Sequence, residues 1–496
     1  MMSSQNRICL ITPPSPFLLD ERVFLHIGIL KVAAVLEREG YQVDFLDLAG
    51  VPDCQDALKI YLDQNPTTST FGFTATTPQI PYAVLLAELI NEFSGAKIIL
   101  GGTHCSLMYS AKLKEDKKGI FGRANKDIER LVQVFDTLVI GDGEKAVLTA
   151  IEEDLIIVNA DDTKSDYFLT NEEFSNLPMP ARHLVDMYSY KYNIEGNKAV
   201  SLICQLGCPF KCTFCGGRNS PFLRKIRTRS AESVIKEVRF LYNTYHYTGF
   251  MFYDDELNVN KEWKNLLQEL VNLQKEVGET FTFRGFVKAE LFTQEQADLM
   301  YAAGFRWLLT GFESGDERIL INIQKNATIE DNTRCIQYAK NAGLKVKALM
   351  SLGHAGESKE SIQNTKKWLI EVKPEEFDCT IITTYPGTPY FDDAVLEDEH
   401  YVYTSPKTGD KLYQTNVDYF TEPDYYKGDP DGGYVSHVWT DYITAEELVI
   451  ERDKLEREVR EELGIKFNPA GGFVKFEHSM GQGKLPSTIL KSSYGK

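Results

Sequence analysis

The chain has 496 residues, of which 54 are lysine or arginine and 72 are aspartate or glutamate, so its formal charge is −18. Hydrophobic residues make up 43% and charged residues 25%, the balance of a globular protein, and the length indicates about three domains. This composition excludes collagen, wholesale disorder and a coiled coil, and the acidic charge argues against a dedicated binder of duplex DNA or anionic membranes.

Apolar runs alternate with amphipathic stretches over residues 1–155. Five runs are predicted to be buried strands, at residues 8–14, 42–48, 70–75, 97–102 and 137–144. Between the first two runs, Ile29, Val32 and Leu36 recur at helical spacing, and Gly40 ends the predicted helix. This alternation predicts an α/β domain with a doubly wound, Rossmann-like parallel sheet, whose ligands bind at the carboxyl ends of the strands.

Residues 156–195 lose this periodicity and are predicted to be a linker. Alternation resumes in residues 196–395, with strands predicted at 201–206, 250–255, 281–287, 306–314, 345–353 and 377–387. Six strand–helix units are two short of a complete TIM barrel. We therefore expect a partial (β/α)6 barrel with its active site at the carboxyl ends of the strands.

Residues 396–496 are predicted to be a small helical and irregular region that acts as a lid or a support. Thr444 and Glu447 form a capping box, and the helix that follows is expected to pack across the barrel and to end at Gly464. Tyrosines either line a substrate lid or form a packing surface here, and the sequence leaves both open for Tyr390, Tyr401, Tyr403, Tyr419, Tyr425 and Tyr426.

The nine cysteines are unevenly spread, because four of them lie between residues 204 and 215. An odd number with one dense cluster indicates reduced thiols and one metal site rather than a disulfide framework. The N-terminal sequence has no signal-peptide pattern, and no stretch approaches the roughly 18 apolar residues of a membrane span. These features predict a cytoplasmic protein.

Cys208, Cys212 and Cys215 have the spacing CxxxCxxC. Three thiolates on one short loop can hold three irons of a [4Fe–4S] cube and leave the fourth iron open to chelate an amine and a carboxylate. Structural iron–sulfur and zinc sites normally have four ligands, and Cys204 is the candidate for a fourth. Cys204 lies inside an apolar strand, whose alternation can turn the side chain away from the loop. Both ligand sets remain open at this point.

This cysteine motif follows the first strand of a partial barrel and has Phe214 just before its last cysteine, a combination that resembles the radical S-adenosylmethionine (SAM) enzyme superfamily over residues 196–395. Further segments resemble its motifs in chain order, and residues 351–358 resemble its Gly-Pro-Gly-Glu turn with Ala355 in place of proline. The resemblance implies that the cofactor is contacted by Phe214, by Asp254 and Asp255 at its amino group, by Glu313 and Ser314 at its ribose and methionine portions, and by Pro386 and Gly387 near the adenine.

The N-terminal domain resembles the cobalamin-binding domain of cobalamin-dependent radical enzymes. The resemblance rests on domain order, on ITPP at the first strand, and on the glycine-rich segments 101–104 and 141–144. It implies that cobalamin is bound by Thr12, Thr74, Thr76, Gly101, Gly102, His104, Gly141, Gly143 and Glu144. The chain has no Asp-x-His-x-x-Gly motif, so we expect no histidine from that motif on cobalt. His104 is expected at the surface or against the phosphate tail, with a structural role as the alternative.

Together the resemblances imply a cobalamin-dependent enzyme that methylates an unactivated carbon, or phosphorus, of a small-molecule or peptide substrate through a 5′-deoxyadenosyl radical and methylcobalamin. A flavodoxin- or ferredoxin-type donor is the expected protein partner, and neither nucleic acid nor membrane is expected. The alternatives are a rearrangement, cyclisation or oxygenation with the same cofactors, and a methylthiotransferase with a second cluster on Cys9, Cys54 and Cys105. A structural or electron-transfer iron–sulfur protein is the non-enzymatic alternative.

A short basic segment follows the cysteine loop. This segment comprises Arg224, Lys225, Arg227 and Arg229. Its side chains are expected either to bind a phosphate, a carboxylate or an acidic electron donor, or to bind no ligand and precede a helix that is capped by Ser230.

Overall fold

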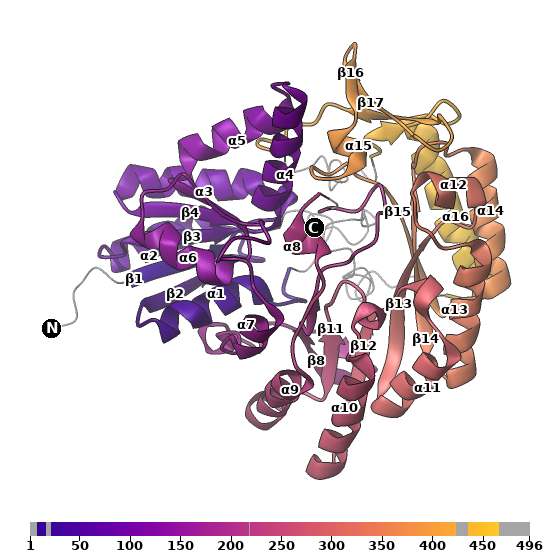
Figure 1. Cartoon of the computed structure of the whole chain (residues 1–496), viewed down its shortest axis with the longest axis horizontal. Coiled ribbons are helices and arrows are strands. Elements are labelled where there is room, and N and C mark those ends of the chain that lie inside the picture. Colours follow the sequence, from indigo (N-terminus) through magenta and orange to yellow (C-terminus); the bar gives the residue numbers. More distant parts are fainter. Residues whose placement is uncertain (1–6, 16–20, 218, 423–434, 466–496) are drawn as a thin grey trace.

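The computed structural model describes residues 7–15, 21–217, 219–422 and 435–465. Its N-terminal part is a parallel six-stranded sheet in the order β2-β1-β3-β4-β5-β6 (Figure 1). The strands are β1 (Arg7–Thr12), β2 (Gln42–Asp47), β3 (Thr70–Thr74), β4 (Lys97–Gly101), β5 (Thr137–Gly141) and β6 (Ile157–Ala160). All five predicted strands are therefore confirmed. The order reverses between β1 and β3, so a ligand crevice is expected at their carboxyl ends.

Helices cover both faces of this sheet (Figure 1). They are α1 (Ile27–Arg38), α2 (Cys54–Gln64), α3 (Ile80–Phe93), α4 (Thr103–Lys118), α5 (Arg123–Val134) and α6 (Gly143–Glu152). Helices α1 and α6 contact each other on one face, while α2, α3, α4 and α5 form a chain of contacts on the other. The apolar stripe predicted for the first helix is buried at Ile29 and Leu36, which explains why this segment folds onto the sheet.

The predicted linker is partly regular structure. Strand β6 pairs in parallel with β5, so the first sheet extends beyond the expected boundary at residue 155. The same segment contains α7 (Asn171–Asn176), and it ends in β7 (Asn193–Ile194), which pairs antiparallel with β8. The short strand β6 escaped the sequence pattern because only four residues pair, and polar residues follow at once.

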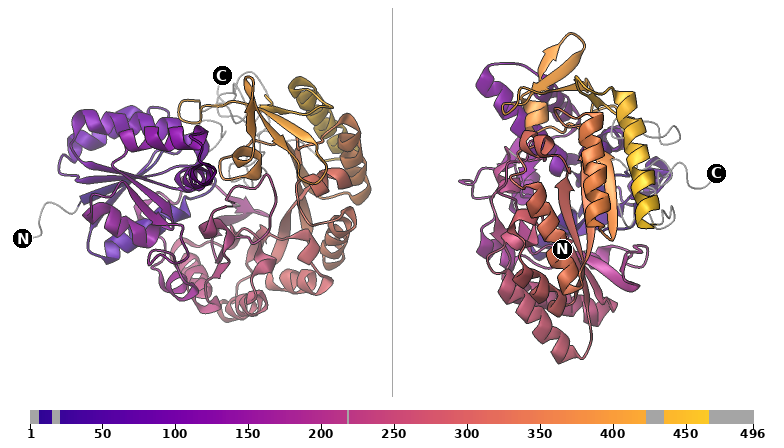
Figure 2. Two further views of the ribbon diagram at one scale, coloured as in Figure 1. Left: turned by 45° about the horizontal axis from the view of Figure 1, so that its top comes forward. Right: turned by 90° about the vertical axis from the view of Figure 1, so that its right-hand side faces the viewer.

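The second sheet holds six parallel strands in the order β15-β14-β13-β12-β11-β8, with β7 added at the β8 edge. They are β8 (Asn197–Leu202), β11 (Gly249–Phe252), β12 (Thr282–Phe286), β13 (Phe305–Glu313), β14 (Lys345–Leu352) and β15 (Glu376–Ile381). Because β15 and β7 are the two ends of this order, the barrel is open, as predicted. Figures 1 and 2 show the curled sheet with its helices on the outside.

The outer helices between these strands are α9 (Ala231–Tyr245), α10 (Trp263–Val277), α11 (Gln294–Ala303), α13 (Ile329–Ala342) and α14 (Lys359–Val372). Shorter pieces line the open side, namely β9 (Gln205–Leu206), α8 (Pro221–Arg224), β10 (Arg227–Thr228), α12 (Glu317–Asn322) and α15 (Pro389–Asp392). Ser230 caps α9 as predicted, since its hydroxyl accepts a hydrogen bond from the Ser233 amide.

The C-terminal region begins with an antiparallel sheet in the order β16-β17-β18-β19. Its strands are β16 (Val395–Glu397), β17 (His400–Thr404), β18 (Lys411–Thr415) and β19 (Val438–Trp439), and helix α16 (Ala445–Leu463) follows. The capping box at Thr444 and Glu447 is confirmed, with 3.2 Å from the Glu447 amide to the Thr444 hydroxyl. Helix α16 packs along α14 and β15, as expected (Figure 2).

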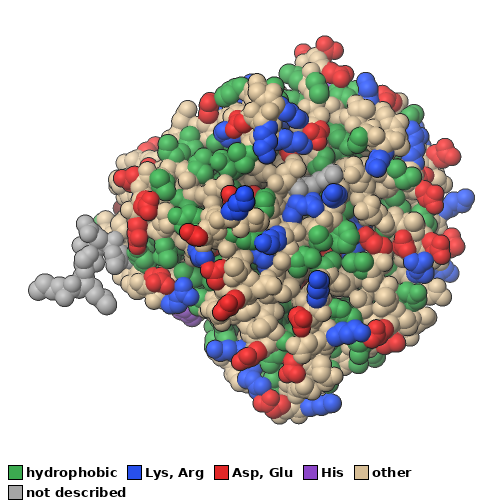
Figure 3. All heavy atoms as spheres, viewed as in Figure 1, with side chains coloured by type: hydrophobic (Ala, Val, Ile, Leu, Met, Phe, Trp, Pro, Cys, Tyr) green, Lys and Arg blue, Asp and Glu red, His purple; other side chains and the backbone are tan. Residues whose placement is uncertain are grey.

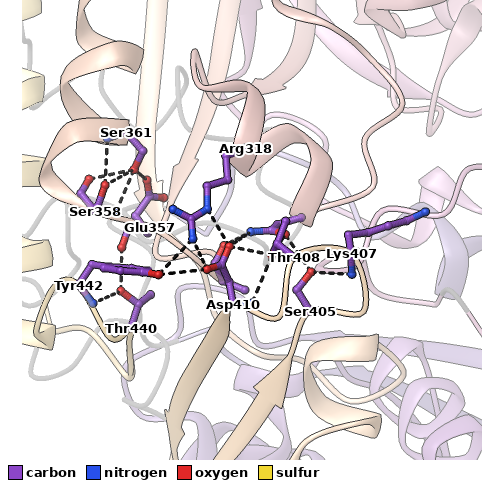
Figure 4. Close-up of polar contacts among 12 residues, drawn as sticks. Arg318, Glu357, Ser358, Ser361, Ser405, Lys407, Thr408, Asp410, Thr440 and Tyr442 are labelled. Atoms are coloured by element: carbon purple, nitrogen blue, oxygen red, sulfur yellow. Dashed lines mark hydrogen bonds and ion pairs between the residues drawn. The ribbon is translucent and has the colours of Figure 1, made fainter.

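A polar network anchors this sheet to the barrel (Figure 4). Asp410, in the turn between β17 and β18, forms an ion pair with Arg318 of α12 and accepts a hydrogen bond from the Asn322 amide group at 2.8 Å. The same Asn322 group donates to the carbonyl of Ala355, in the turn after β14. The C-terminal region therefore supports a turn at the mouth of the barrel.

The tyrosines of this region mostly pack. Tyr390, Tyr403 and Tyr419 are buried, and the ring of half-buried Tyr401 lies 3.9 Å from the Arg123 guanidinium. Tyr425 and Tyr426 lie outside the described residues. No helix in the described ranges is both long and apolar enough to cross a membrane.

Candidate functional site

The cysteine loop runs from β9 to α8 and is held close to the backbone that follows it. The Cys208 amide donates to the Leu223 carbonyl at 3.0 Å. Gly207 adopts a φ of +87°, and a Cβ there would run into the Lys225 carbonyl, so this position requires glycine. The loop thus closes on itself around Cys208, Cys212 and Cys215.

All three cysteines line one cavity between the two domains. The N-terminal domain supplies the facing wall with Thr76 and Thr77 after β3 and with Thr103 and Leu107 of α4, while Tyr385 enters from the segment after β15. Of these, only Thr76 was predicted as a ligand-binding residue, because strand-end spacing does not show which turns reach across a domain interface.

Cys204 does not line this cavity. It is fully buried, and its thiol donates to Asp254 Oδ2 at 2.5 Å, while its amide donates to Oδ1 at 2.7 Å. Among the described residues, no three cysteine, histidine or carboxylate side chains converge on a single metal-ion position. Three thiolates that each bind a different iron of a cube do not need such convergence, so the arrangement suits a three-cysteine cluster and not a four-ligand zinc site.

The two aspartates after β11, Asp254 and Asp255, have different surroundings, which the sequence did not predict. Asp254 holds Cys204, and Asp255 accepts the Gly207 amide at 2.7 Å, so both fasten the start of the cysteine loop. Burial raises the pKa of each to about 6. Asp255 also lines the cavity, whereas Asp254 does not. Asp255 is thus the aspartate that faces the cavity, and the contact of this acidic segment with an amino group stays a prediction.

Glu256 is the third carboxylate in the run FYDDE, the segment that resembles the acidic second-strand motif, although only Asp254 and Asp255 were named as cofactor contacts. In the described part of the chain its Oε2 is buried without a hydrogen-bond partner. Burial raises the pKa of Glu256 to about 7, while the positive charges of Lys288 and Lys325 act in the opposite direction. An unpartnered buried carboxylate suits a cationic ligand group, because such a group would supply the missing donor.

Glu313 ends β13 in a left-handed conformation with a φ of +67°. Its carboxylate lies 3.3 Å from the Lys325 ammonium and accepts the Ser351 hydroxyl at 2.7 Å. Ser314 instead turns into the helix layer, where its hydroxyl lies 3.1 Å from that of Thr365. Glu313 is thus held firmly in place at the barrel mouth, and Ser314 is packed behind it.

His354 continues this network. The Ser351 hydroxyl donates its hydrogen to Glu313, so the Ser351 oxygen accepts a hydrogen bond from His354 Nε2 at 2.8 Å. With its proton on Nε2, the His354 ring accepts a hydrogen bond at Nδ1 from the Tyr390 hydroxyl, at 3.3 Å. Burial lowers the pKa of His354 to about 3, so the ring is neutral. The ring also packs against Phe214 at 5.1 Å, which fixes the aromatic residue of the cysteine motif from behind.

Pro386 and Gly387 lie where the barrel touches the N-terminal domain. Gly387 has a φ of +75°, and a Cβ there would lie 3.1 Å from the Leu107 side chain of α4. Its amide donates to Asp392 at 3.0 Å. This close approach brings the segment after β15 to the edge of the cavity that Leu107 and Tyr385 line.

The predicted residues at the N-terminal strand ends fall into two groups. Thr74 is the last residue of β3, and Thr76, two residues beyond it, lines the cavity. Thr12, Gly101, Gly102, Gly141, Gly143 and Glu144 are not among the residues that line it. A Cβ at Gly102 would lie 2.6 Å from the Ala75 nitrogen, and one at Gly141 2.7 Å from the Ala160 carbonyl carbon, so both glycines permit close packing of neighbouring chain segments.

One expectation at these strand ends needs correction. His104 is not at the surface: it is fully buried, with Nδ1 3.2 Å from the Thr77 hydroxyl and Nε2 3.1 Å from Asp127. It acts from behind the cavity by holding Thr77. Glu144 is also buried, and burial together with the nearby Asp142 raises its pKa.

The basic segment after the cysteines is not a free patch. Arg227 is buried in an ion pair with Asp142 of the N-terminal domain, and Arg229 pairs with Glu237 at 2.6 Å. Arg224 donates to the carbonyls of Pro209 and Phe210 in the cysteine loop. The basic side chains that were predicted to bind a ligand therefore mostly form ion pairs and hydrogen bonds within the protein, and these hold the loop in place.

The remaining cysteines are buried and form no disulfide bond within the described residues. Cys9, Cys54 and Cys105 lie in the core of the N-terminal domain, and burial raises the pKa of Cys9 and Cys105. None of these three is among the residues that line the cavity of the CxxxCxxC cysteines. This geometry does not favour a second cluster of the methylthiotransferase kind. Cys335 and Cys379 lie in the barrel core.

The residues around the site were compared with known protein families and with related proteins. Residues 202–369, which hold the cysteine loop, match the Radical SAM superfamily. The chain is 25% identical over 408 residues to an uncharacterized methyltransferase of Pyrococcus horikoshii, covering 78% of this chain and 83% of that protein. It is 26% identical over 358 residues to the anaerobic magnesium-protoporphyrin IX monomethyl ester cyclase of Rubrivivax gelatinosus, covering 68% and 61%.

Among solved structures, the chain is similar to the radical S-adenosylmethionine methyltransferase TsrM from Kitasatospora setae with cobalamin and a [4Fe–4S] cluster bound. The TM-score is 0.61 at 16% identity, and the match covers 94% of this chain and 90% of that one. The expected fold, a Rossmann-like domain before a partial barrel, is confirmed. Residues 202–369 thus belong to the radical SAM superfamily, within a chain that has the fold of TsrM.

Proposed function

We propose that this chain is a cobalamin-dependent radical SAM enzyme that methylates an unactivated carbon, or phosphorus, of a small-molecule or peptide substrate. One observation carries the proposal: the three cysteines and the turns of the N-terminal domain line the same cavity. A methyl donor on the N-terminal side and a radical source on the barrel side would then face one substrate. The methyltransferase name of a relative and the cobalamin of the TsrM structure support this proposal.

The residues present fit a three-cysteine cluster. Cys208, Cys212 and Cys215 would hold it, while the thiol of Cys204 is engaged by Asp254. When bound, the cluster and SAM supply a 5′-deoxyadenosyl radical, and the corrin supplies the methyl group. The unpartnered Glu256 carboxylate would accept hydrogen bonds from the SAM ammonium group.

The chain's own contribution is binding, orientation and exclusion of water. Asp255 accepts the Gly207 amide and the Leu223 carbonyl accepts the Cys208 amide, so the start of the cysteine loop is preorganised. Leu107 and Tyr385 place apolar surface across the cavity, which keeps water from a reactive radical. We retain the other strand-end residues as predicted contacts of the corrin, since glycine and threonine there allow a large planar ligand to approach.

The proposal includes a partner and a compartment. A flavodoxin- or ferredoxin-type protein would supply the electron. The absence of disulfide bonds among the nine cysteines of the described residues supports a reducing, cytoplasmic environment.

The test is anaerobic reconstitution of the full chain with iron, sulfide and hydroxocobalamin. We expect about four irons per chain, a corrin absorbance, and SAM turnover to both 5′-deoxyadenosine and S-adenosylhomocysteine. Cys212→Ala should lose the cluster but keep the corrin. A reconstituted protein that does not cleave SAM under strong reductant would refute the proposal.

A second candidate is a non-methylating radical reaction with the same cofactors. The similarity to a protein named as a cyclase supports it. Formation of 5′-deoxyadenosine without S-adenosylhomocysteine, in the presence of a substrate that is converted, would favour this candidate over methylation. About eight irons per chain without corrin would instead indicate a methylthiotransferase.

A further inference from the structure

A surface groove lies directly beside the cysteine loop. Its apolar part is formed by Leu320, Ile321 and Ala327, and Ile321 is 53% exposed. Lys211 and Lys407 approach it from two different segments, the cysteine loop and the β17–β18 turn. One carboxylate, that of Glu317, also borders the groove. The result is a small apolar surface with two lysines at its rim.

The two lysines carry charge that the protein does not neutralise. Neither ammonium group forms an ion pair with a carboxylate in the described part of the chain, although the protein has a net charge of −18 and acidic side chains are spread over the face that Figure 3 shows. In Figure 4 the Lys407 side chain extends away from the polar network around Asp410. The rim of the groove therefore carries two lysine charges against the single carboxylate of Glu317.

The groove is joined to the cluster ligands by a short path. Helix α12 contributes Leu320 and Ile321 to the groove, and the Ile323 carbonyl just beyond it accepts the Thr213 amide at 2.9 Å. Thr213 is the neighbour of Cys212 in the chain. A molecule seated in the groove is thus separated from a cluster ligand by one hydrogen bond and a few covalent bonds.

We propose that this groove is the docking surface for an acidic one-electron carrier, specifically a reduced flavoprotein of the flavodoxin class. The inference rests on the proposed function. In the step it serves, the carrier is oxidised by one electron and the cluster held by the three cysteines is reduced by one, with no bond made and no proton moved. Small interfaces with charged rims suit such transient encounters, because opposite charge speeds association without a large buried area.

The test compares the double variant Lys211→Glu/Lys407→Glu with the unaltered full chain. Binding of oxidised flavodoxin is measured at low salt by NMR titration of the flavodoxin, and SAM cleavage is driven either by reduced flavodoxin or by titanium(III) citrate. We expect the double variant to bind flavodoxin about tenfold more weakly, to lose the salt dependence of binding, and to lose more of the flavodoxin-driven rate than of the titanium-driven rate. Lys236→Glu on α9, another exposed lysine with no ion pair among the described residues, is the matched control and should bind normally.

Flavodoxin binding that is equal in the double variant and the unaltered protein would overturn the inference. So would loss of binding to an acidic substrate peptide in the double variant while flavodoxin binding stays normal. If the unaltered protein does not cleave SAM with titanium(III), the proposed enzymatic function fails. The flavodoxin titration still decides the docking surface in that case, because it does not depend on turnover.

Discussion

Replacing Cys204 by alanine separates the two ligand sets that the cysteine pattern permits. The Cys204 thiol is fully buried and donates to Asp254, outside the cavity that the other three cysteines line. The variant should therefore bind the same amount of iron as the unaltered chain, about four per chain. If Cys204 were instead a cluster ligand, iron content would fall.

The same substitution has a predictable cost in stability. A hydrogen bond to a charged group contributes about 1.5–3 kcal/mol. Asp254 keeps the Cys204 backbone amide at 2.7 Å after the change, so we expect a loss of about 2 kcal/mol in the free energy of unfolding. Burial raises the pKa of Asp254 to about 6, and the thiol pairs with its ionised form. The loss should hence be larger at pH 8 than at pH 5.

Iron and sulfide analysis after anaerobic reconstitution, with urea unfolding at both pH values, measures these effects. Cys335→Ala is the matched control, because its thiol is equally buried in the barrel core away from the cysteine loop. The Cys335→Ala variant should have a lower free energy of unfolding, because removal of the thiol leaves a cavity, and it should bind as much iron as the unaltered chain. A Cys204→Ala protein that binds clearly less iron than the Cys335→Ala protein would refute the three-cysteine assignment.

Three further changes test other parts of the structure. Glu256→Gln should weaken SAM binding to the reconstituted protein by about 10- to 100-fold in equilibrium dialysis, since it removes a charged acceptor; unchanged affinity would place the ammonium group elsewhere. Arg227→Ala should lower the free energy of unfolding by about 3–5 kcal/mol in urea, because Asp142 would remain buried without its partner, and adding Asp142→Asn should recover part of the loss. Burial raises the pKa of Asp378 to about 8, so this carboxyl makes stability fall as pH rises from about 4 to about 8. Asp378→Asn should flatten that fall, and an unchanged slope between pH 5 and pH 8.5 would contradict it.

The sequence alone determined the elements and their order. Apolar runs of five or six residues separated by amphipathic stretches specified the strands, because burial on both faces of a parallel sheet leaves a continuous apolar signal. The two ends of helix α16, the capping box at Thr444 and the C-terminal Gly464, could also be predicted from the sequence, since each depends on groups within one helical turn. The CxxxCxxC spacing specified three ligands because all of them lie on one short loop.

Only the tertiary structure decided how the polar residues are used. Asp254, Arg227 and His104 looked available for ligands, yet each is satisfied by a partner from a distant segment of the chain. Glu256 looked like the end of an acidic run, and its Oε2 is buried without a hydrogen-bond partner among the described residues. Strand periodicity is a local property, whereas the partner of a buried charge is set by which distant segment folds against it, and a single sequence does not encode that pairing in any short pattern.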